Sequence, residues 1–302
     1  MQLNDITSLE LELTSRCNAA CFLCPRTNPN FTKELNHNRE ITPENLKNWL
    51  PTNLLKNLKQ LKLKGTFSDP LISKHFVQII EYFNRNSSLE RININTNGSL
   101  RNKKFWQWLA TNLPKKSKVT FGIDGLEDTH AIYRVNTDFN KIIKNAVSFI
   151  EAGGSAIWQF IEFEHNKHQI EECKSLAEEL KFEKFFVMHN DRIEDDEDRK
   201  KITESIIGKK ISCRSITNKQ IFINWDGEVF PCCMTGVFSV KSKNYFDFVS
   251  WKKNILNQDF KNINLNYHTL ENILNFYNDF YQTVETEPKL RVCGKYCGIK
   301  KY

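Results

Sequence analysis

Residues 9–26 read LELELTSRCNAACFLCPR, and this stretch decides both the fold and the chemistry of the chain. Leucines alternate with glutamates at its start, which is the period-two pattern of a strand with one buried face. The strand leads directly into Cys17, Cys21 and Cys24, spaced Cys-x3-Cys-x2-Cys. Three thiolates this close are expected to ligate three irons of one 4Fe–4S cube and to leave the fourth iron open. Structural zinc is the alternative, but it usually takes four ligands, and nothing near the motif supplies a fourth.

This motif, placed directly after a first strand, resembles the defining motif of the radical S-adenosylmethionine (SAM) superfamily. The resemblance implies that the three cysteines hold a SAM-binding 4Fe–4S cluster and that S-adenosylmethionine docks at its open iron. An open metal position serves chemistry rather than structure, as the free site of a catalytic zinc does. The chain is therefore expected to be an enzyme.

The chain has 302 residues, nine cysteines and a formal net charge of +7. That length gives room for one large domain and a small one. No apolar run reaches the ~18 residues that cross a bilayer, and the N-terminal segment lacks a secretory signal, so we expect a cytoplasmic protein without membrane contact. Thiols stay reduced in that compartment, so the cysteines indicate metal rather than disulfides. The scattered lysines are typical of a solvated surface, and we do not expect a nucleic-acid partner.

Strand patterns alternate with helix patterns along the first two thirds of the chain. Strands are expected at residues 9–13, 58–64, 91–95, 118–123, 156–163 and 184–188. Alternation of this kind predicts a parallel sheet of the α/β class with right-handed crossovers. Six units are fewer than the eight of a closed TIM barrel, and the resemblance implies an open, partial (β/α)6 TIM-like barrel. We expect this barrel at residues 1–190, a charged linker at 191–204 and a further domain at 205–302.

The loop after the second strand, Gly-Thr-Phe-Ser-Asp-Pro, stands where the radical SAM superfamily carries Gly-Gly-Glu-Pro. The resemblance implies that Asp69 receives the ammonium group of SAM, since a carboxylate suits a cationic amine. Ser68 stands where glycine is usual, and we count it among the cofactor-binding residues. An ordinary Asp-Pro turn is the alternative reading of this loop.

A second set of expected SAM contacts follows the third and fourth strands. Gly122-Ile123-Asp124-Gly125 with the later Arg134 resembles the Ser-Ile-Asp-Gly and Arg pattern of radical SAM enzymes that carry extra cluster domains. The resemblance implies that Asp124 and Arg134 bind the cofactor, with Arg134 gripping the SAM carboxylate bidentately. A surface salt bridge is the alternative for Arg134. Thr96 and Asn97 either approach SAM or form a plain Asn-Gly turn.

Five more cysteines fall in the C-terminal third, around a hairpin signal at Asp226-Gly227. The spacing Cys-x13-Gly-x4-Cys resembles the start of the SPASM domain, and the small number of cysteines resembles its shortened relative, called twitch. We therefore expect a small C-terminal domain of a β-hairpin plus helices that holds one auxiliary 4Fe–4S cluster. The resemblance implies four ligands and leaves Cys233 as the spare, because adjacent side chains diverge; the expected ligands are Cys213, Cys232, Cys293 and Cys297. Structural zinc on the same thiolates is the alternative.

The activity implied is reductive cleavage of SAM to a 5′-deoxyadenosyl radical, which then removes a hydrogen atom from a substrate. An electron donor such as flavodoxin or ferredoxin would supply the electron, and the auxiliary cluster would take an electron from the substrate or orient it. The favoured hypothesis is a radical SAM oxidoreductase acting on a small molecule such as a sugar or aminocyclitol alcohol. The alternatives are a peptide- or protein-modifying enzyme that forms a crosslink, thioether or epimer, and a metal-binding protein without activity. The sequence identifies no catalytic acid or base.

Overall fold

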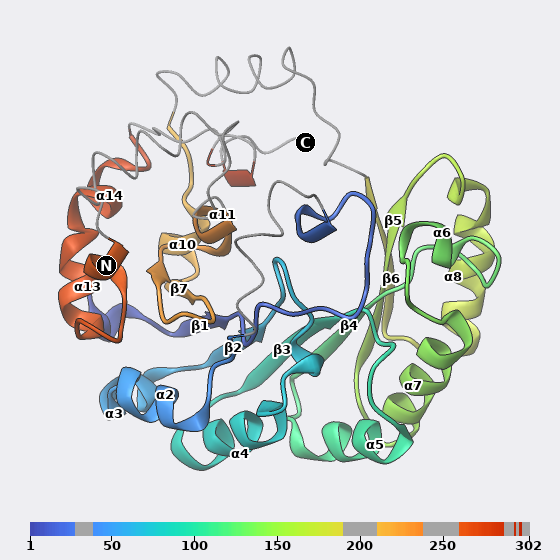
Figure 1. The fold of residues 1–302 in the computed structure, drawn as a ribbon, viewed down its shortest axis with the longest axis horizontal. Helices are drawn as coiled ribbons and strands as arrows, with labels where there is room; N and C mark the ends of the chain where they lie inside the picture. Colours follow the sequence, from blue (N-terminus) through green and yellow to red (C-terminus); the bar gives the residue numbers. More distant parts are fainter. Residues whose placement is uncertain (28–38, 190–209, 238–259, 287–292, 294–295, 298–302) are drawn as a thin grey trace.

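The chain folds around one eight-stranded sheet, seen in the computed structural model, which describes residues 1–27, 39–189, 210–237, 260–286, 293 and 296–297 (Figure 1). The strand order is β6-β5-β4-β3-β2-β1-β7-β8. The first six strands are parallel and lie where the sequence predicts them: β1 (Ser8–Leu11), β2 (Gln60–Leu63), β3 (Arg91–Thr96), β4 (Lys118–Gly122), β5 (Ala156–Glu162) and β6 (Lys184–His189). The prediction of an open, partial α/β barrel is confirmed.

Helices connect the parallel strands and follow one another around the outer side of the sheet (Figure 1). They are α2 (Pro43–Trp49), α3 (Thr52–Asn57), α4 (Phe76–Asn86), α5 (Lys103–Asn112), α6 (His130–Tyr133), α7 (Phe139–Glu151) and α8 (Ile170–Glu179), with single 3-10 turns η1 (Leu3–Asp5), η2 (Pro25–Thr27), η3 (Pro70–Ile72) and η4 (Lys167–Gln169). Local signals fix several helix ends. Thr42 caps α2 through its side chain, with Pro43 at the first helical position, and Gly153 adopts a left-handed φ of 91° just after α7.

The two faces of the sheet differ in chemistry. Leu11, Leu63 and Ile94 pair across β1, β2 and β3, and this face is fully buried against the helices. Cys173 of α8 belongs to the same apolar core. On the opposite, inner face, Glu10 pairs with Lys62 in the neighbouring strand. Because side chains alternate along a strand, the inner face carries polar groups throughout these strands.

The C-terminal region joins the same sheet. β7 (Gln220–Ile223) runs parallel to β1, and β8 (Val229–Phe230) forms the predicted hairpin with β7. Its helices are α10 (Arg214–Thr217), α11 (Cys233–Val237), η5 (Phe260–Ile263), α13 (Leu270–Phe276) and α14 (Asn278–Thr283). Tyr277 separates α13 from α14 and donates its hydroxyl to the backbone oxygen of Val229 at 2.9 Å. The expected linker at 191–204 lies outside the described residues.

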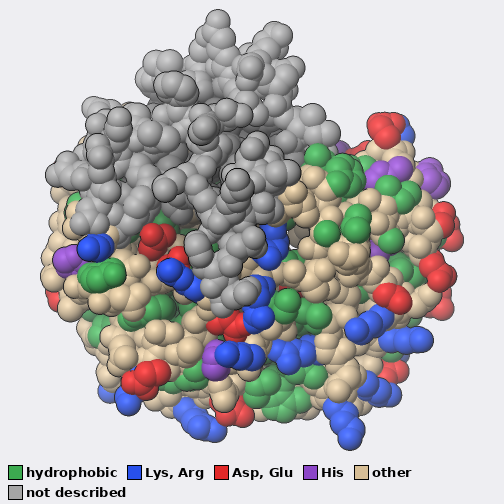
Figure 2. Space-filling model, in the orientation of Figure 1, with side chains coloured by type: hydrophobic (Ala, Val, Ile, Leu, Met, Phe, Trp, Pro, Cys, Tyr) green, Lys and Arg blue, Asp and Glu red, His purple; other side chains and the backbone are tan. Residues whose placement is uncertain are grey.

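Acidic and basic side chains are interspersed over the described part of the face in Figure 2. Among the described residues, none of the helices has the length and apolar character that a bilayer crossing requires.

Candidate functional site

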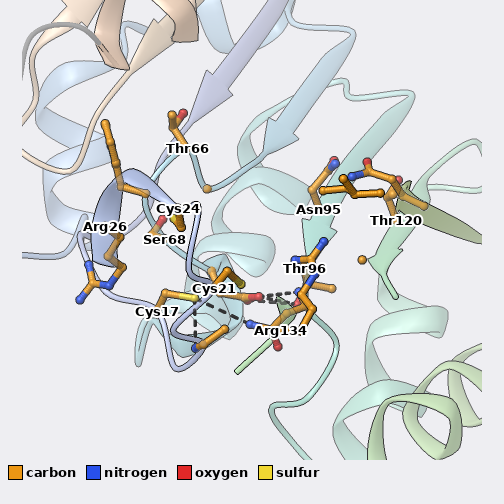
Figure 3. A pocket seen from close by; sticks show the side chains of 18 of the residues that line it. Cys17, Cys21, Cys24, Arg26, Thr66, Ser68, Asn95, Thr96, Thr120 and Arg134 are labelled. Atoms are coloured by element: carbon orange, nitrogen blue, oxygen red, sulfur yellow. Dashed lines mark hydrogen bonds between the residues drawn. The ribbon is translucent and has the colours of Figure 1, made fainter. Parts of the chain in front are cut away.

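A pocket opens at the carboxyl ends of the parallel strands, where the βα loops meet (Figure 3). Loops build the sites of such folds because the strands hold them rigidly from below. All three cysteines of the first motif and five of the six expected SAM contacts line this pocket. The lining residues are Cys17, Ala19, Cys21, Cys24, Arg26, Gly65, Thr66, Phe67, Ser68, Asp69, Asn95, Thr96, Asn97, Thr120, Gly122, Tyr133, Arg134, Gln159 and Ile161.

Backbone hydrogen bonds hold the cysteine loop in place beside the pocket. The amide of Cys24 donates to the oxygen of Cys21 at 2.9 Å, and the amide of Ala20 donates to the oxygen of Val135 at 2.9 Å. Cys17 Sγ accepts from the amide of Ala19 at 3.4 Å and from Asn97 Nδ2 at 3.8 Å. Hydrogen bonds to the ligating sulfurs are one of the ways in which proteins tune iron–sulfur clusters.

Burial and the nearby charge of Asp69 raise the pKa of Cys17 to about 12. Cys21 and Cys24 also act on Cys17, so the three thiols stand close together around the pocket. No three His, Cys, Asp or Glu side chains in the described ranges are close enough to share one metal ion. The buried thiol of Cys17 would need the positive charge of a bound metal to ionise near neutral pH, because a coordinating metal deprotonates its thiol ligands. The donor set therefore fits a 4Fe–4S cluster.

Asp69 lies at the bottom of the loop after β2 and is 2% exposed. Its carboxylate accepts from the amide of Leu71 at 2.9 Å, from the amide of Asn97 at 2.7 Å and from Thr96 Oγ1 at 2.8 Å. Burial raises the pKa of Asp69, and these hydrogen bonds oppose the rise. Asp69 thus ties the loop after β2 to the end of β3, and Thr96 and Asn97 lie beside it in the pocket.

Arg134 lines the pocket, whereas Asp124 is fully buried behind it and does not line it. Arg134 Nε donates to Asp124 Oδ2 at 2.6 Å, and Asp124 Oδ1 accepts from the amide of Ile161 at 2.7 Å. Burial alone would lower the pKa of Arg134, but the Asp124 carboxylate more than offsets this, so the pKa rises. Asp124 therefore holds a permanently charged guanidinium at the rim of the pocket.

Two further buried side chains brace this arrangement. His130 Nδ1 accepts from the amide of Asp124 at 3.1 Å, and burial lowers the pKa of His130 to about 3, so the imidazole is neutral. Asn166 stands at the N-cap position of η4 but makes no side-chain cap. Its Nδ2 instead donates to the oxygens of Asp124 at 3.1 Å and Ile161 at 3.0 Å.

The second cysteine group comes together at the C-terminal region. Cys213 precedes α10, Cys232 precedes α11, and Cys293 and Cys297 lie near the end of the chain. Burial raises the pKa of Cys232 to about 11, and the charges of Cys213 and Cys297 add to the rise. The charges of Cys232, Cys297 and Cys213 likewise add to the burial that raises the pKa of Cys293, so the four thiols are near enough to act on one another.

Cys233 points elsewhere. Burial raises the pKa of its thiol, and the next cause is Glu10 of β1, to whose carboxylate the thiol is hydrogen-bonded. The four other thiols fit the donor set of a fully thiolate-ligated cluster.

Several residues of the pocket carry no recognisable sequence signal. Asn95, Thr120 and Gln159 are polar positions within strands, and only the sheet register shows that they face the pocket. Glu12 is buried beneath the loop after β2 and accepts from the amide of Phe67 at 2.7 Å. The alternation of residues around Glu12 predicts which face of the sheet its side chain lies on, but not that it binds the amide of Phe67.

The model of the SPASM iron–sulfur cluster-binding domain matches residues 213–298. A probable GTP 3′,8-cyclase of Methanocaldococcus jannaschii is 31% identical over 96 residues, which cover 32% of this chain and 30% of that protein. The GTP 3′,8-cyclase of Desulforamulus reducens is 26% identical over 124 residues, covering 40% of this chain and 35% of that protein. The chain thus matches only about a third of the length of these curated relatives.

Solved structures share the fold at low sequence identity. Streptococcus suis SuiB bound to precursor peptide SuiA has a TM-score of 0.59 at 14% identity, covering 96% of this chain and 71% of that one. The structure of anSMEcpe with bound AdoMet and Kp18Cys peptide has a TM-score of 0.57 at 15% identity, covering 90% and 82%. Together with the Cys-x3-Cys-x2-Cys loop at the mouth of the barrel, these findings identify the chain as a radical SAM protein with a C-terminal iron–sulfur domain of the SPASM/twitch type.

Proposed function

We propose that the chain is a radical SAM oxidoreductase that oxidises a small, polar molecule such as a sugar or aminocyclitol alcohol. The observation that carries the proposal is one pocket that combines three cysteine thiols with Arg134, whose guanidinium is partly buried and held by an ion pair with Asp124. In this proposal Cys17, Cys21 and Cys24 hold the SAM-binding cluster, and Cys213, Cys232, Cys293 and Cys297 hold the auxiliary cluster.

When bound and given one electron by the donor, the cluster and SAM would supply a 5′-deoxyadenosyl radical, with methionine as the leaving group, and this radical would remove a hydrogen atom from a C–H bond of the substrate. The residues of the chain bind the cofactor and the substrate and orient them. Arg134 offers its guanidinium to the carboxylate of SAM, because planar guanidinium groups grip carboxylates bidentately. Ser68, Asp69, Thr96 and Asn97 line the same pocket and are proposed to surround the methionine part of SAM, while Asp124 contributes by holding Arg134.

The proposal of a polar substrate is supported by the wall of the pocket inside the barrel. Asn95 pairs with Thr120 across β3 and β4, and Gly122 pairs with Gln159 across β4 and β5. Figure 3 shows Asn95 and Thr120 lying together on the other side of the pocket from Arg26. These amides and hydroxyls offer hydrogen bonds and no large apolar surface, which favours a substrate rich in hydroxyl or amine groups.

A peptide- or protein-modifying enzyme is the second candidate. It is favoured by two structural neighbours that are bound to peptides, SuiB with precursor peptide SuiA and anSMEcpe with Kp18Cys peptide. Both resemble this chain over 90% or more of its length. In both candidates the reacting part of the substrate would lie against the same polar wall of the pocket. A peptide would also extend outside the pocket, whereas a small molecule would not.

Reductive cleavage tests the proposal. Anaerobically reconstituted protein given dithionite and SAM is expected to form 5′-deoxyadenosine, and Cys17→Ala is expected to abolish it; normal cleavage by that variant would overturn the assignment. A panel of deuterated polyols, aminocyclitols and peptides then separates the candidates, because the true substrate transfers deuterium to 5′-deoxyadenosine. Transfer from peptides alone would replace the first candidate by the second.

The proposal also includes a one-electron donor such as flavodoxin or ferredoxin. Seven ligating thiols suit a reducing compartment, and the cytoplasm is the proposed location.

A further inference from the structure

We propose that Glu12 is a positioning residue that holds the loop 65–69 in the shape that receives the cationic amine of SAM. The inference rests on the proposed function, since that amine belongs to the proposed cofactor. Glu12 does not line the pocket; it lies behind the loop and acts through it.

The contacts of Glu12 are concentrated on this loop. The side chain is 1% exposed, and its Oε1 accepts from the amide of Phe67 at 2.7 Å and from Ser68 Oγ at 3.0 Å. The amide of Thr66 is also hydrogen-bonded to the carboxyl group. Three consecutive loop residues thus donate to the side chain of Glu12, which directly follows β1. The serine that replaces the usual glycine at position 68 has a partner for its hydroxyl.

Because the amides of Thr66 and Phe67 point toward Glu12 behind the loop, the directions of the neighbouring backbone carbonyls are also determined. Each peptide unit is planar and trans, so its C=O points away from its N–H. When the amides of Thr66 and Phe67 face Glu12, the carbonyls of Gly65 and Thr66 face away from it. Every residue from Gly65 to Asp69 lines the pocket, so these acceptors are available on the pocket side.

The alternative receiver of the amine, the Asp69 carboxylate, is already engaged. Both of its oxygens accept hydrogen bonds from Leu71, Thr96 and Asn97. Backbone carbonyls of the loop therefore supply the remaining acceptors for an ammonium group, and Asp69 supplies charge from behind.

The loop turns tightly at Gly65. A Cβ added to Gly65 would lie 1.5 Å from the backbone oxygen of Ser68, so the chain turns back on itself at this point. Glu12 is the only described side chain that bonds the amide of Phe67 and the hydroxyl of Ser68 together. Without it the two donors would lose their buried acceptor, which is costly.

The test compares Glu12→Gln with Glu12→Ala in cluster-reconstituted protein, using S-adenosylhomocysteine as the binding probe. Glutamine keeps an oxygen acceptor at the same place, whereas alanine removes it. We expect Glu12→Ala to weaken probe binding by about tenfold, with Glu12→Gln close to wild type. Glu10→Ala is the matched control, because Glu10 is a buried glutamate two residues earlier, within β1, whose Oε2 accepts from Gln220 Nε2 at 3.2 Å.

Hydrogen exchange gives a readout that does not depend on the probe. The amides of Thr66 and Phe67 should exchange faster in Glu12→Ala and at the wild-type rate in Glu12→Gln and Glu10→Ala. If Glu12→Ala does not fold, Glu12→Asp withdraws the acceptor from the loop while keeping a carboxyl group, and about twofold to fourfold weaker binding is expected.

The outcomes separate the two proposals. Wild-type protein that does not bind the probe would overturn the proposed function. Wild-type protein that binds it, together with Glu12→Ala binding equally well, would overturn the role of Glu12. Loss of binding in Glu12→Gln with an intact fold would also overturn it, because the acceptor is retained there. Retained binding in Glu12→Gln with loss in Glu12→Ala or Glu12→Asp supports it.

Discussion

The guanidinium of Arg134 packs directly over Gly122, so closely that a Cβ at position 122 would lie 2.5 Å from Arg134 Nη2. The Asp124 carboxylate accepts a hydrogen bond from Nε of the same guanidinium, and the centre of the Tyr133 ring lies 5.5 Å from Arg134 Cζ. The absence of a side chain at Gly122 therefore creates the space in which the charged group stands. The serine that is common at this position in related patterns would not fit beside this arginine conformation.

Gly122→Ala is expected to displace Arg134 and to weaken SAM binding by about tenfold, since a lost charge-assisted hydrogen bond costs about 1.5–3 kcal/mol. The fold should survive, because the displaced atoms belong to the end of a flexible side chain. Equilibrium binding of SAM to reconstituted protein measures the effect, with the melting temperature as a control for folding.

Asp124→Asn provides the partner test. It keeps the shape of the side chain and removes the charge that fixes Arg134, so it should weaken SAM binding in the same direction. Tight binding in both variants would show that Arg134 does not contact the cofactor.

His130 should make the chain sensitive to acid. Burial, assisted by the charge of Arg134, lowers its pKa from 6.5 to about 3, while Asp138 opposes the shift. The unfolded chain takes up a proton below pH 6.5 that the folded chain refuses, so the free energy of unfolding falls as the pH drops through this window. The slope from this group is at most about 1.4 kcal/mol per pH unit. Urea unfolding at pH 5, 6 and 7 should show a shallower slope in His130→Asn; equal slopes would contradict the assignment.

The titration of Glu12 should change the free energy of unfolding with pH in the opposite direction from that of His130. Burial is the main cause that raises its pKa from 4.5 to about 8, and the charge of Glu10 adds to the rise. Between these values the folded chain keeps a proton that the unfolded chain has lost, so the free energy of unfolding falls as the pH rises. The contribution is again at most about 1.4 kcal/mol per pH unit.

Glu12→Gln removes that titration, so its unfolding free energy should depend less on pH between 5.5 and 7.5 than that of wild type, by the linkage argument. Lys64 directly after β2 and Glu10 are unchanged in the variant, which isolates the effect of Glu12. Urea titrations at three pH values measure it, and parallel profiles would rule out a raised pKa.

Cys232 and Cys233 form a natural pair for testing the auxiliary site. Cys232 groups with Cys213, Cys293 and Cys297, whereas Cys233 contacts Glu10. Reconstituted wild-type protein should hold about eight irons per chain, and Cys232→Ala about four, since one cube contains four. Cys233→Ala should stay near eight.

Iron and sulfide analysis of the three proteins shows which of the two cysteines ligates the auxiliary cluster. Iron loss in Cys233→Ala with full loading of Cys232→Ala would exchange the two roles. About four irons in wild type would remove the auxiliary cluster altogether.

Much of the fold follows from local patterns in the sequence. Alternating leucines place β1, and Thr42 with Pro43 places the start of α2, because these signals act within a few residues. The cysteine loop could be located in the same way, since its ligands are close in sequence.

What the sequence could not supply depends on long-range pairing. The pattern around Asp124 predicts a cofactor contact, but only the fold shows that this carboxylate faces Arg134 from behind. The parallel pairing of β7 with β1 joins residues more than two hundred positions apart and has no local signal. Glu12 is similar, because its partners belong to a different βα unit.

The electron paramagnetic resonance spectrum of the reduced protein, recorded before and after addition of SAM, tests the central claim most directly. If the cluster held by Cys17, Cys21 and Cys24 has an open iron that SAM occupies, the spectrum of anaerobically reconstituted wild-type protein will change on addition. The same addition should leave the spectrum of Cys17→Ala unchanged. A wild-type spectrum that stays the same with full iron loading would contradict the account.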